Sequence, residues 1–201
     1  MRARLFAVFL GLMLAGAAQA AEPIARVVGQ DGVAFVLRST AQPEALAVGA
    51  DLFVDDEVRT GADGRVVVES GAGLKLVIGA ASEVRIRRWL VESPRSRIDI
   101  VLGMVTGVLR LLGEPVAVPR TVEVQTRAAV ASVRSTEWLV EATGAGTAVF
   151  SIEGAVAVRT PAAGVTLGPG DGTDVRLGAA PSLPVRWGQA RVERTLARVP
   201  F

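Results

Sequence analysis

The sequence predicts an all-β protein, folded as a single domain of short strands. Two features of the chain lead to this prediction. The composition is 50% hydrophobic but only 4% aromatic, so the core must be built from Val, Leu, Ile and Ala. These apolar residues come in short β-branched runs bounded by Gly and Ser, which is a strand signal. A helix would instead need apolar positions recurring about every 3.6 residues over a longer window.

The first 20 residues are expected to be an export leader and not part of the fold. Arg2 and Arg4 give a positive start, residues 5–18 are uncharged and mostly apolar, and Ala18-Gln19-Ala20 is the small-x-small pattern that signal peptidase requires. A membrane-spanning helix needs about 20 apolar residues, more than this run offers. We therefore expect cleavage after Ala20, a periplasmic or secreted protein, and no membrane span in the mature chain.

Strands are expected along most of the remaining chain. Residues 84–87, Val-Arg-Ile-Arg, alternate strictly between apolar and charged side chains. We therefore expect one face of this strand to be buried and the other to carry guanidinium groups into water. The predicted strands are residues 66–69, 74–78, 84–87, 121–125, 129–134, 137–142, 147–152, 155–159, 165–167 and 174–177.

The middle and the end of the chain are less regular. Residues 98–112 are punctuated by glycines, each of which costs a helix interior about 1 kcal/mol relative to Ala, so strands are predicted there as well. Residues 181–201 are predicted to be a C-terminal tail, forming either a short amphipathic helix over 187–198 or a loose extension. The β-domain is therefore placed at residues 21–180. The strand spacing fits a sandwich-like or a twisted solenoid-like arrangement, and both remain open.

The residue inventory argues against catalysis. The chain has no Cys and no His, which removes ordinary zinc sites, thiol nucleophiles and His-based triads. Removing Arg2 and Arg4 with the leader leaves 20 basic and 20 acidic residues, so the charge surplus typical of a nucleic-acid-binding protein is missing. We predict a protein that is not an enzyme, with no catalytic residues, no cofactor, no metal site and no nucleic-acid partner.

A few polar groups remain as candidates for chemistry. The acidic run Asp55-Asp56-Glu57 and the turn carrying Asp171 and Asp174 offer oxygens of the kind that Ca²⁺ binds, but each is expected to be a plain turn. Ser135 with Lys75, the only lysine, is the one pairing that a hydrolase alternative could use. The three Trp residues are expected to be packing anchors rather than a ligand surface.

Several motifs fall in a recognisable order along the chain. The most specific is residues 126–138, Thr-Arg-Ala-Ala-Val-Ala-Ser-Val-Arg-Ser-Thr-Glu-Trp, between two Val-rich alternating stretches. It resembles the "T-x-x-A-x-x-x-V-R-G-T-x-F" signature of the FecR domain family. Leu46 to Thr60, the "I-x-x-G-x-V" stretch at Ile100 to Val105, and the Gly-containing turns near 153–156 and 167–171 resemble other parts of that family pattern, so the resemblance runs from about Ala25 to Leu177.

The sequence departs from the family pattern at three places. Ser135 stands for the family's Gly, Trp138 for its Phe, and Asp55 for the Gly before the opening Asp. If the two Gly positions adopt a positive φ, Ser and Asp are strained there, although Asp tolerates the left-handed region better than most residues.

The resemblance implies a stand-alone periplasmic β-module with a twisted, solenoid-like arrangement of strands. Its implied function is that of a non-enzymatic interaction module of the cell envelope, bound to an envelope protein or glycan that the sequence does not identify. The alternative is a FecR-type regulator of a sigma-factor signalling system. The residues implied as structural or partner contacts are Thr126, Ala129, Val133, Arg134, Ser135, Thr136, Glu137 and Trp138.

The signature segment also predicts its own geometry. Ala129, Ala131 and Val133 occupy odd positions, whereas Trp138 and the apolar residues after it occupy even ones. Because side chains alternate along a strand with a period of two, this change of parity predicts a bulge or tight bend near Ser135-Thr136. Val130 is then expected to be half exposed on the opposite face, and Trp138 to pack under the bend.

Overall fold

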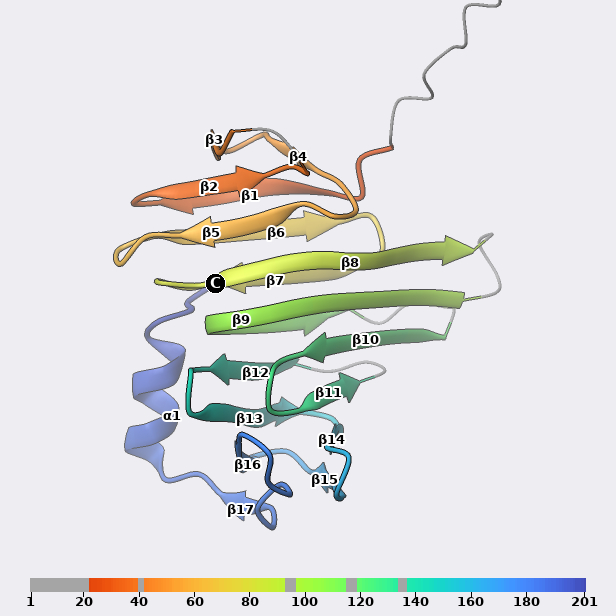
Figure 1. Ribbon diagram of the computed structural model, residues 1–201, viewed down its shortest axis with the longest axis vertical. Helices are drawn as coiled ribbons and strands as arrows, with labels where there is room; N and C mark the ends of the chain where they lie inside the picture. Colours follow the sequence, from red (N-terminus) through yellow and green to blue (C-terminus); the bar gives the residue numbers. More distant parts are fainter. Residues whose placement is uncertain (1–21, 40–41, 93–96, 115–118, 134–136) are drawn as a thin grey trace, which may run out of the picture.

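The protein is a stack of β-strands in two facing sheets. The computed structural model describes residues 22–39, 42–92, 97–114, 119–133 and 137–201. The chain advances along the long axis of the molecule, from the red N-terminal strands at one end to the blue C-terminal strands at the other (Figure 1). The arrangement is therefore sandwich-like in its two layers and solenoid-like in the way strands are added in chain order.

Each sheet has its own set of strands. Sheet A contains, in spatial order, β4 (Asp51–Leu52), β1 (Ala25–Asp31), β6 (Arg65–Ser70), β7 (Leu74–Ile78), the second half of β9 (Arg97–Gly113), β12 (Glu137–Ala142), β13 (Gly146–Glu153), β16 (Asp171–Arg176) and β17 (Val185–Arg186). Sheet B contains β3 (Glu44–Ala45), β2 (Ala34–Leu37), β5 (Glu57–Thr60), β8 (Glu83–Glu92), the first half of β9, β10 (Arg120–Gln125), β11 (Val130–Val133), β14 (Val156–Arg159) and β15 (Gly164–Leu167).

Strand β9 belongs to both sheets. Its first half pairs with β8 and β10 in sheet B, and its second half pairs with β7 and β12 in sheet A. The change of sheet occurs at Gly107, whose φ is +106°, and a Cβ at this position would collide with Ser82. Only Gly adopts this backbone conformation without strain and also leaves room for Ser82. The β9–β10 pair is parallel, while the other paired strands run antiparallel.

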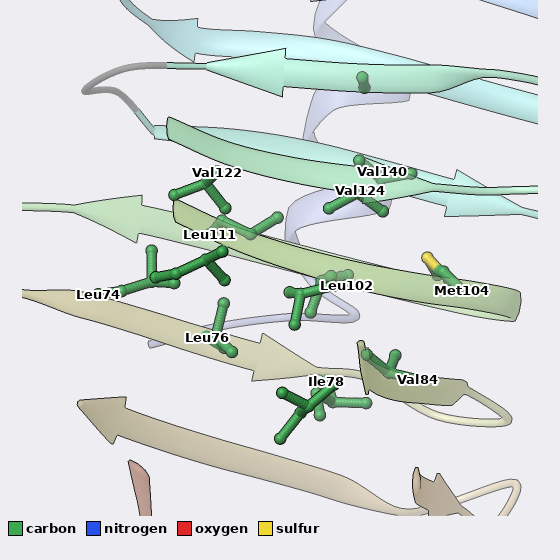
Figure 2. Close-up of a cluster of buried hydrophobic side chains, with 14 of the residues drawn as sticks. Leu74, Leu76, Ile78, Val84, Leu102, Met104, Leu111, Val122, Val124 and Val140 are labelled. Carbon is green, nitrogen blue, oxygen red and sulfur yellow. The ribbon is translucent and has the colours of Figure 1, made fainter. Parts of the chain in front are cut away.

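The main core lies between the two sheets. Its residues are the inward-facing ones, which alternate with outward-facing residues along each strand. In β10, buried and half-buried residues alternate strictly, and Val122 and Val124 are among the buried ones. Figure 2 shows these side chains in one cluster with Leu74, Leu76 and Ile78 of β7, with side chains of β9 between the two groups. The core is aliphatic, as the composition predicts, with Trp138 as its completely buried aromatic residue.

A second apolar cluster covers the outer face of sheet A. Helix α1 (Gln189–Leu196) lies beside one end of β12 and β13 in Figure 1 and runs across the direction of these strands. Trp187 and Val199 pack there on outward-facing residues of sheet A, which are Val67, Val77, Val108, Leu139 and Phe150. This second cluster explains why β6 carries three consecutive apolar residues, Val66-Val67-Val68: one face of the strand packs in the main core and the other packs in the second cluster.

The predicted fold class is confirmed, and most predicted strands are present within one or two residues of their expected bounds. The expectation of uniformly short strands is wrong for β9, which has 17 residues, because Gly107 bends the strand and does not end it. Of the two alternatives for the tail, the short helix is the observed one. No helix in the described part of the chain has the length and apolar character needed to cross a membrane.

Candidate interaction surface

The signature segment lies where the chain passes from sheet B to sheet A. It contains the β10–β11 turn, all of β11, and the start of β12. Arg134, Ser135 and Thr136 of the predicted site lie outside the described residues. The other predicted positions, from Thr126 to Trp138, divide into two groups: buried apolar side chains and polar groups that hold turns or the C-terminal tail.

Thr126 holds the β10–β11 turn. Its hydroxyl oxygen accepts hydrogen bonds from the backbone N–H groups of Ala128 and Ala129, at 3.3 and 3.0 Å. The backbone N–H of Thr126 donates in turn to the carbonyl of Ala129, at 2.9 Å. This is the local side-chain-to-backbone pattern that favours Thr at turns. The same hydroxyl contacts Thr147 of sheet A, so the turn is fixed to both sheets.

Ala129, Val133 and Trp138 are core residues. Each belongs to the cluster between the sheets, and Trp138 is completely buried. The predicted change of parity is confirmed: the buried positions are odd-numbered in β11 and even-numbered for Trp138 and Val140 in β12, and Val130 is half buried on the opposite face. The register of β12 against β13 shifts between Glu137 and Trp138, so a bulge lies at the start of β12. The bend predicted at Ser135-Thr136 lies outside the described residues.

Glu137 points away from the core, as its parity predicts. Its carboxylate forms a charge-assisted hydrogen bond with Arg110 of β9, and the two side chains are only 16% and 17% exposed. Arg110 also donates to the carbonyl oxygen of Val199, at 3.2 Å, and lies over the ring of Phe201, 4.0 Å from its centre. Glu137 thus orients the arginine that holds the end of the chain on sheet A.

The first acidic run forms a turn, as predicted, but the second prediction is wrong: Asp171 begins strand β16 and Asp174 lies within it, where it pairs with Arg191 at 2.6 Å. Asp55 adopts a φ of 72°, the left-handed conformation expected where the family pattern has Gly. The buried Asp56 accepts the backbone N–H of Phe53 at 3.0 Å and pairs with Arg38 at 3.2 Å. Asp171 caps its own turn through the N–H of Gly168. Within the described ranges, no group of three Asp or Glu residues is placed to hold a metal ion.

A buried arginine was not among the predicted residues. Arg120 is 2% exposed and donates to the carbonyl oxygens of Ala72 and Gly73 in the β6–β7 turn and of Glu114 at the end of β9, at 2.7 to 2.9 Å. Burial lowers the pKa of its guanidinium, and the nearby charge of Glu114 opposes that shift. The signal was present in the sequence, because Arg120 has the same parity as the buried Val122 and Val124.

The outer face of sheet B carries an open cleft of about 460 Å³, which we call the arginine cleft. It crosses β8, β9, β10 and β14 and is lined by Arg87, Arg88, Arg97, Asp99, Val101, Thr121, Glu123, Gln125 and Arg159. A second depression of about 400 Å³, the turn groove, lies beside the signature turn between residues 126–130 and 159–161. Arg159 lines both, so they are parts of one surface.

The two outer faces of the molecule therefore differ. Sheet A is partly covered by α1 and the tail, with one depression of about 340 Å³ beside the helix, whereas sheet B presents charged side chains and the two depressions just described. The sequence predicts the guanidinium groups on β8, and Arg85 and Arg87 are exposed as expected. It does not predict that strands from both halves of the chain bring them beside Glu123 and Arg159.

Comparison with known proteins identifies related folds. A family model described as FecR protein matches residues 56–157, just over half of the chain. The structure is similar to two crystal structures, at 1.65 and 2.50 Å, of a candidate anti-sigma factor from Parabacteroides distasonis, with a TM-score of 0.56 for each. The sequence identities are 18% and 19%, so the likeness shows the fold alone. The matched region covers 70% of this chain and 64% and 63% of those chains, less than two thirds of their length. No curated protein gives a significant match.

Proposed function

This chain belongs to the FecR protein family, and on that premise we propose that it is a non-enzymatic regulatory module that acts by binding another protein of the cell envelope. The binding face in this proposal is the outer face of sheet B. The observation that carries it is the asymmetry of the two sheets, because the described tail packs on the outer face of sheet A and not on that of sheet B, where the arginine cleft lies.

The surface has the chemistry of a protein-binding face. Its rim carries charged side chains, several of them arginines, which are enriched where proteins meet. Its turn groove has small apolar residues, Ala128 and Ala129, at its base. These features suit an interface that forms and dissociates, as regulatory contacts do.

The proposed location is the periplasm, after removal of residues 1–20. Intact-mass measurement of the protein from a periplasmic extract is expected to give a chain that begins at Ala21. A mass that includes residues 1–20, found in the membrane fraction, would contradict the proposed location.

A second candidate function is regulation of a sigma factor. It is favoured by the two structural neighbours, which are crystal structures of a candidate anti-sigma factor. The measurement that separates the two candidates is transcription from sigma-factor-dependent promoters in cells with and without the gene. A change that follows deletion and is restored by the full chain supports the regulator.

Site-specific photo-cross-linking in living cells tests the proposed binding face. A photoreactive side chain at Thr121, in the arginine cleft, is expected to capture one defined envelope protein. The same group at Arg194, exposed on α1, is the matched control and should capture none. Equal capture at both positions, or none at either, would overturn the proposal, and capture of glycan in place of protein would redirect it to the cell wall.

A further inference from the structure

The arginine cleft carries more positive than negative charge. Four arginines line it, against the two carboxylates of Asp99 and Glu123. Both carboxylates are already engaged: Asp99 contacts Arg88 at 3.3 Å, and Glu123 contacts Arg159 at 3.4 Å and Gln125 at 2.6 Å. Among the side chains that the structure describes, the two remaining arginines, Arg87 and Arg97, are the ones whose charge is least compensated.

Arg87 is held in place without a carboxylate. Its guanidinium donates to the side-chain oxygen of Gln125 at 3.0 Å, a neutral partner, and no described Asp or Glu lies within ion-pair distance. Arg97 reaches Asp99 only at 3.9 Å. An exposed pair at that separation contributes little, so both guanidinium groups are available to an incoming anion.

The backbone places these arginines. The register of β8 against β9 shifts between Ile86 and Arg88, and this bulge brings the consecutive residues Arg87 and Arg88 to the exposed side together. On the neighbouring strand, Gly103 leaves the floor of the cleft flat: a Cβ there would collide with Nε of Arg87. Arg87 therefore lies across β9 and reaches β10 because position 103 has no side chain.

The cleft continues into the turn groove, whose floor is apolar. Arg159 lines both depressions, and beyond it Ala128 and Ala129 are more than nine-tenths buried, with Val130 half buried beside them. A ligand that follows this surface meets guanidinium groups along the cleft and then, in the turn groove, small apolar side chains beside the exposed Arg127. An extended peptide can present an acidic side chain to the cleft and an apolar one to the turn groove, because every second side chain of an extended chain points to the same face.

We propose that the arginine cleft and the turn groove together bind an extended acidic segment of the partner protein, with carboxylates on Arg87 and Arg97 and an apolar side chain in the turn groove. The inference rests on the proposed function and names the chemistry of the partner. Guanidinium groups bind carboxylates in a two-pronged geometry. A dense array of phosphates fits less well, because Asp99 and Glu123 stand between the arginines and repel a continuous row of negative charge.

Selection from a random dodecapeptide phage library against the full chain tests this directly. The selected peptides are expected to be enriched in Asp and Glu, with an apolar residue at a fixed distance from the acidic ones. The strongest peptide is then synthesised with a fluorescent label, and its Kd is measured by fluorescence polarisation at low and high salt. We expect Kd to rise with salt, since surface charge contacts are screened.

Three variants distinguish binding at the arginine cleft from nonspecific electrostatic attraction between the peptide and the protein. The double variant Arg87→Gln/Arg97→Gln is expected to bind the peptide at least about tenfold more weakly, which corresponds to about 1.4 kcal/mol. Gly103→Ala keeps every charge but displaces Arg87, and is also expected to weaken binding several-fold. Arg194→Gln removes one exposed charge outside the cleft and should leave Kd unchanged. Thermal melts of each variant confirm that the fold is retained.

Four results would overturn the inference: selected peptides without acidic enrichment, equal losses in the cleft and control variants, full binding by Gly103→Ala, or stronger competition by inorganic phosphate or phosphatidylglycerol vesicles than by the unlabelled peptide. Stronger competition by phosphate would assign the cleft to phosphate groups.

Failure of this inference is distinct from failure of the proposed function. A protein captured at Thr121, together with non-acidic selected peptides, would leave the function standing and change only the partner chemistry.

Discussion

The side-chain oxygens of Thr126 and Thr147 lie 2.7 Å apart and join the signature turn of sheet B to the first strand residues of β13 in sheet A. The same hydroxyl accepts hydrogen bonds from the backbone N–H groups of Ala128 and Ala129 and lies within hydrogen-bond distance of the carbonyl of Ala129, at 3.0 Å. Thr126, the first residue of the signature, therefore links the two sheets through a side-chain hydrogen bond.

Replacement of that hydroxyl should be measurable in stability. Thr126→Ala is expected to lower the free energy of unfolding by about 1–2 kcal/mol, because two backbone donors and Thr147 lose their partner. Thr126→Ser keeps the hydroxyl and should recover most of the loss. Urea melts of both variants compare them, and equal stability of Ala and Ser at this position would show that the hydroxyl contributes nothing.

Trp138 is expected to be the most costly single truncation in the signature. Trp138→Ala removes a completely buried indole from the core between the sheets, at a cost of about 3–5 kcal/mol. That is a large fraction of the total stability of about 5–15 kcal/mol usual for a domain. The control is Arg59→Ala, because the Arg59 side chain is 48% exposed and ion pairs at the surface contribute about 0–1 kcal/mol. A Trp138→Ala protein that melts like the parent would refute its role as a folding element.

Arg120 is expected to stabilise the fold through its three carbonyl contacts. Arg120→Met leaves the carbonyl oxygens of Ala72, Gly73 and Glu114 without this donor and should cost about 3 kcal/mol. Arg120→Lys keeps the charge but lacks the planar fork, so an intermediate loss is expected. Apolar residues that replace a buried charge sometimes leave stability unchanged. A Met variant as stable as the parent would therefore show that the three hydrogen bonds of Arg120 do not stabilise the fold.

The contact between Trp187 and sheet A is expected to seal the second apolar cluster. The indole stacks on Phe150, with ring centres 4.7 Å apart, and Arg191 lies 3.6 Å above its other face. Trp187→Ala should lower stability by about 3 kcal/mol and increase the binding of a hydrophobic dye, as outer residues of sheet A become exposed. Leu183→Ala, at a side chain that is 80% exposed, is the matched control. Unchanged dye binding in Trp187→Ala would mean that the tail stays in place without it.

Calcium is expected to leave the melting temperature unchanged. Asp56 is already bound by Phe53 and Arg38, and Asp171 by the backbone of Gly168, so their oxygens do not converge on one point. A real site held at 100 times its Kd would add about 2.7 kcal/mol to stability. Thermal melts with added Ca²⁺ and with chelator check this, and a shift of several degrees would reveal a site at one of these turns.

The sequence predicted local structure better than long-range placement. The bounds of β7 and β12 match the prediction residue for residue, because alternation and turn residues act within a few positions. The burial of Trp138 followed from parity alone. Arg120 was missed although the same parity argument applies, because a charged residue on a buried face needs acceptors that only the folded turn at Ala72 and Gly73 supplies.

The candidate surface could be predicted only in part. Alternation in β8 placed Arg85 and Arg87 outside, but the bulge that exposes Arg88 beside Arg87 depends on the register against β9. That Gly103 makes room for Arg87 is a contact between two strands, and no spacing along the chain encodes it. The length of β9 was missed for a similar reason: each side of Gly107 finds partners in a different sheet, so the bend is retained within one strand.

The sharing of β9 between the sheets determines how the protein can come apart. In an ordinary solenoid each coil contacts only its neighbours, so the ends can open without disturbing the rest. Here one strand pairs with β7 and β12 in sheet A and with β8 and β10 in sheet B, so its loss removes the centre of both at once. Amide hydrogen exchange in the middle strands of the two sheets should therefore require the same global opening, while the two-residue strands β3, β4 and β17 exchange by local fraying.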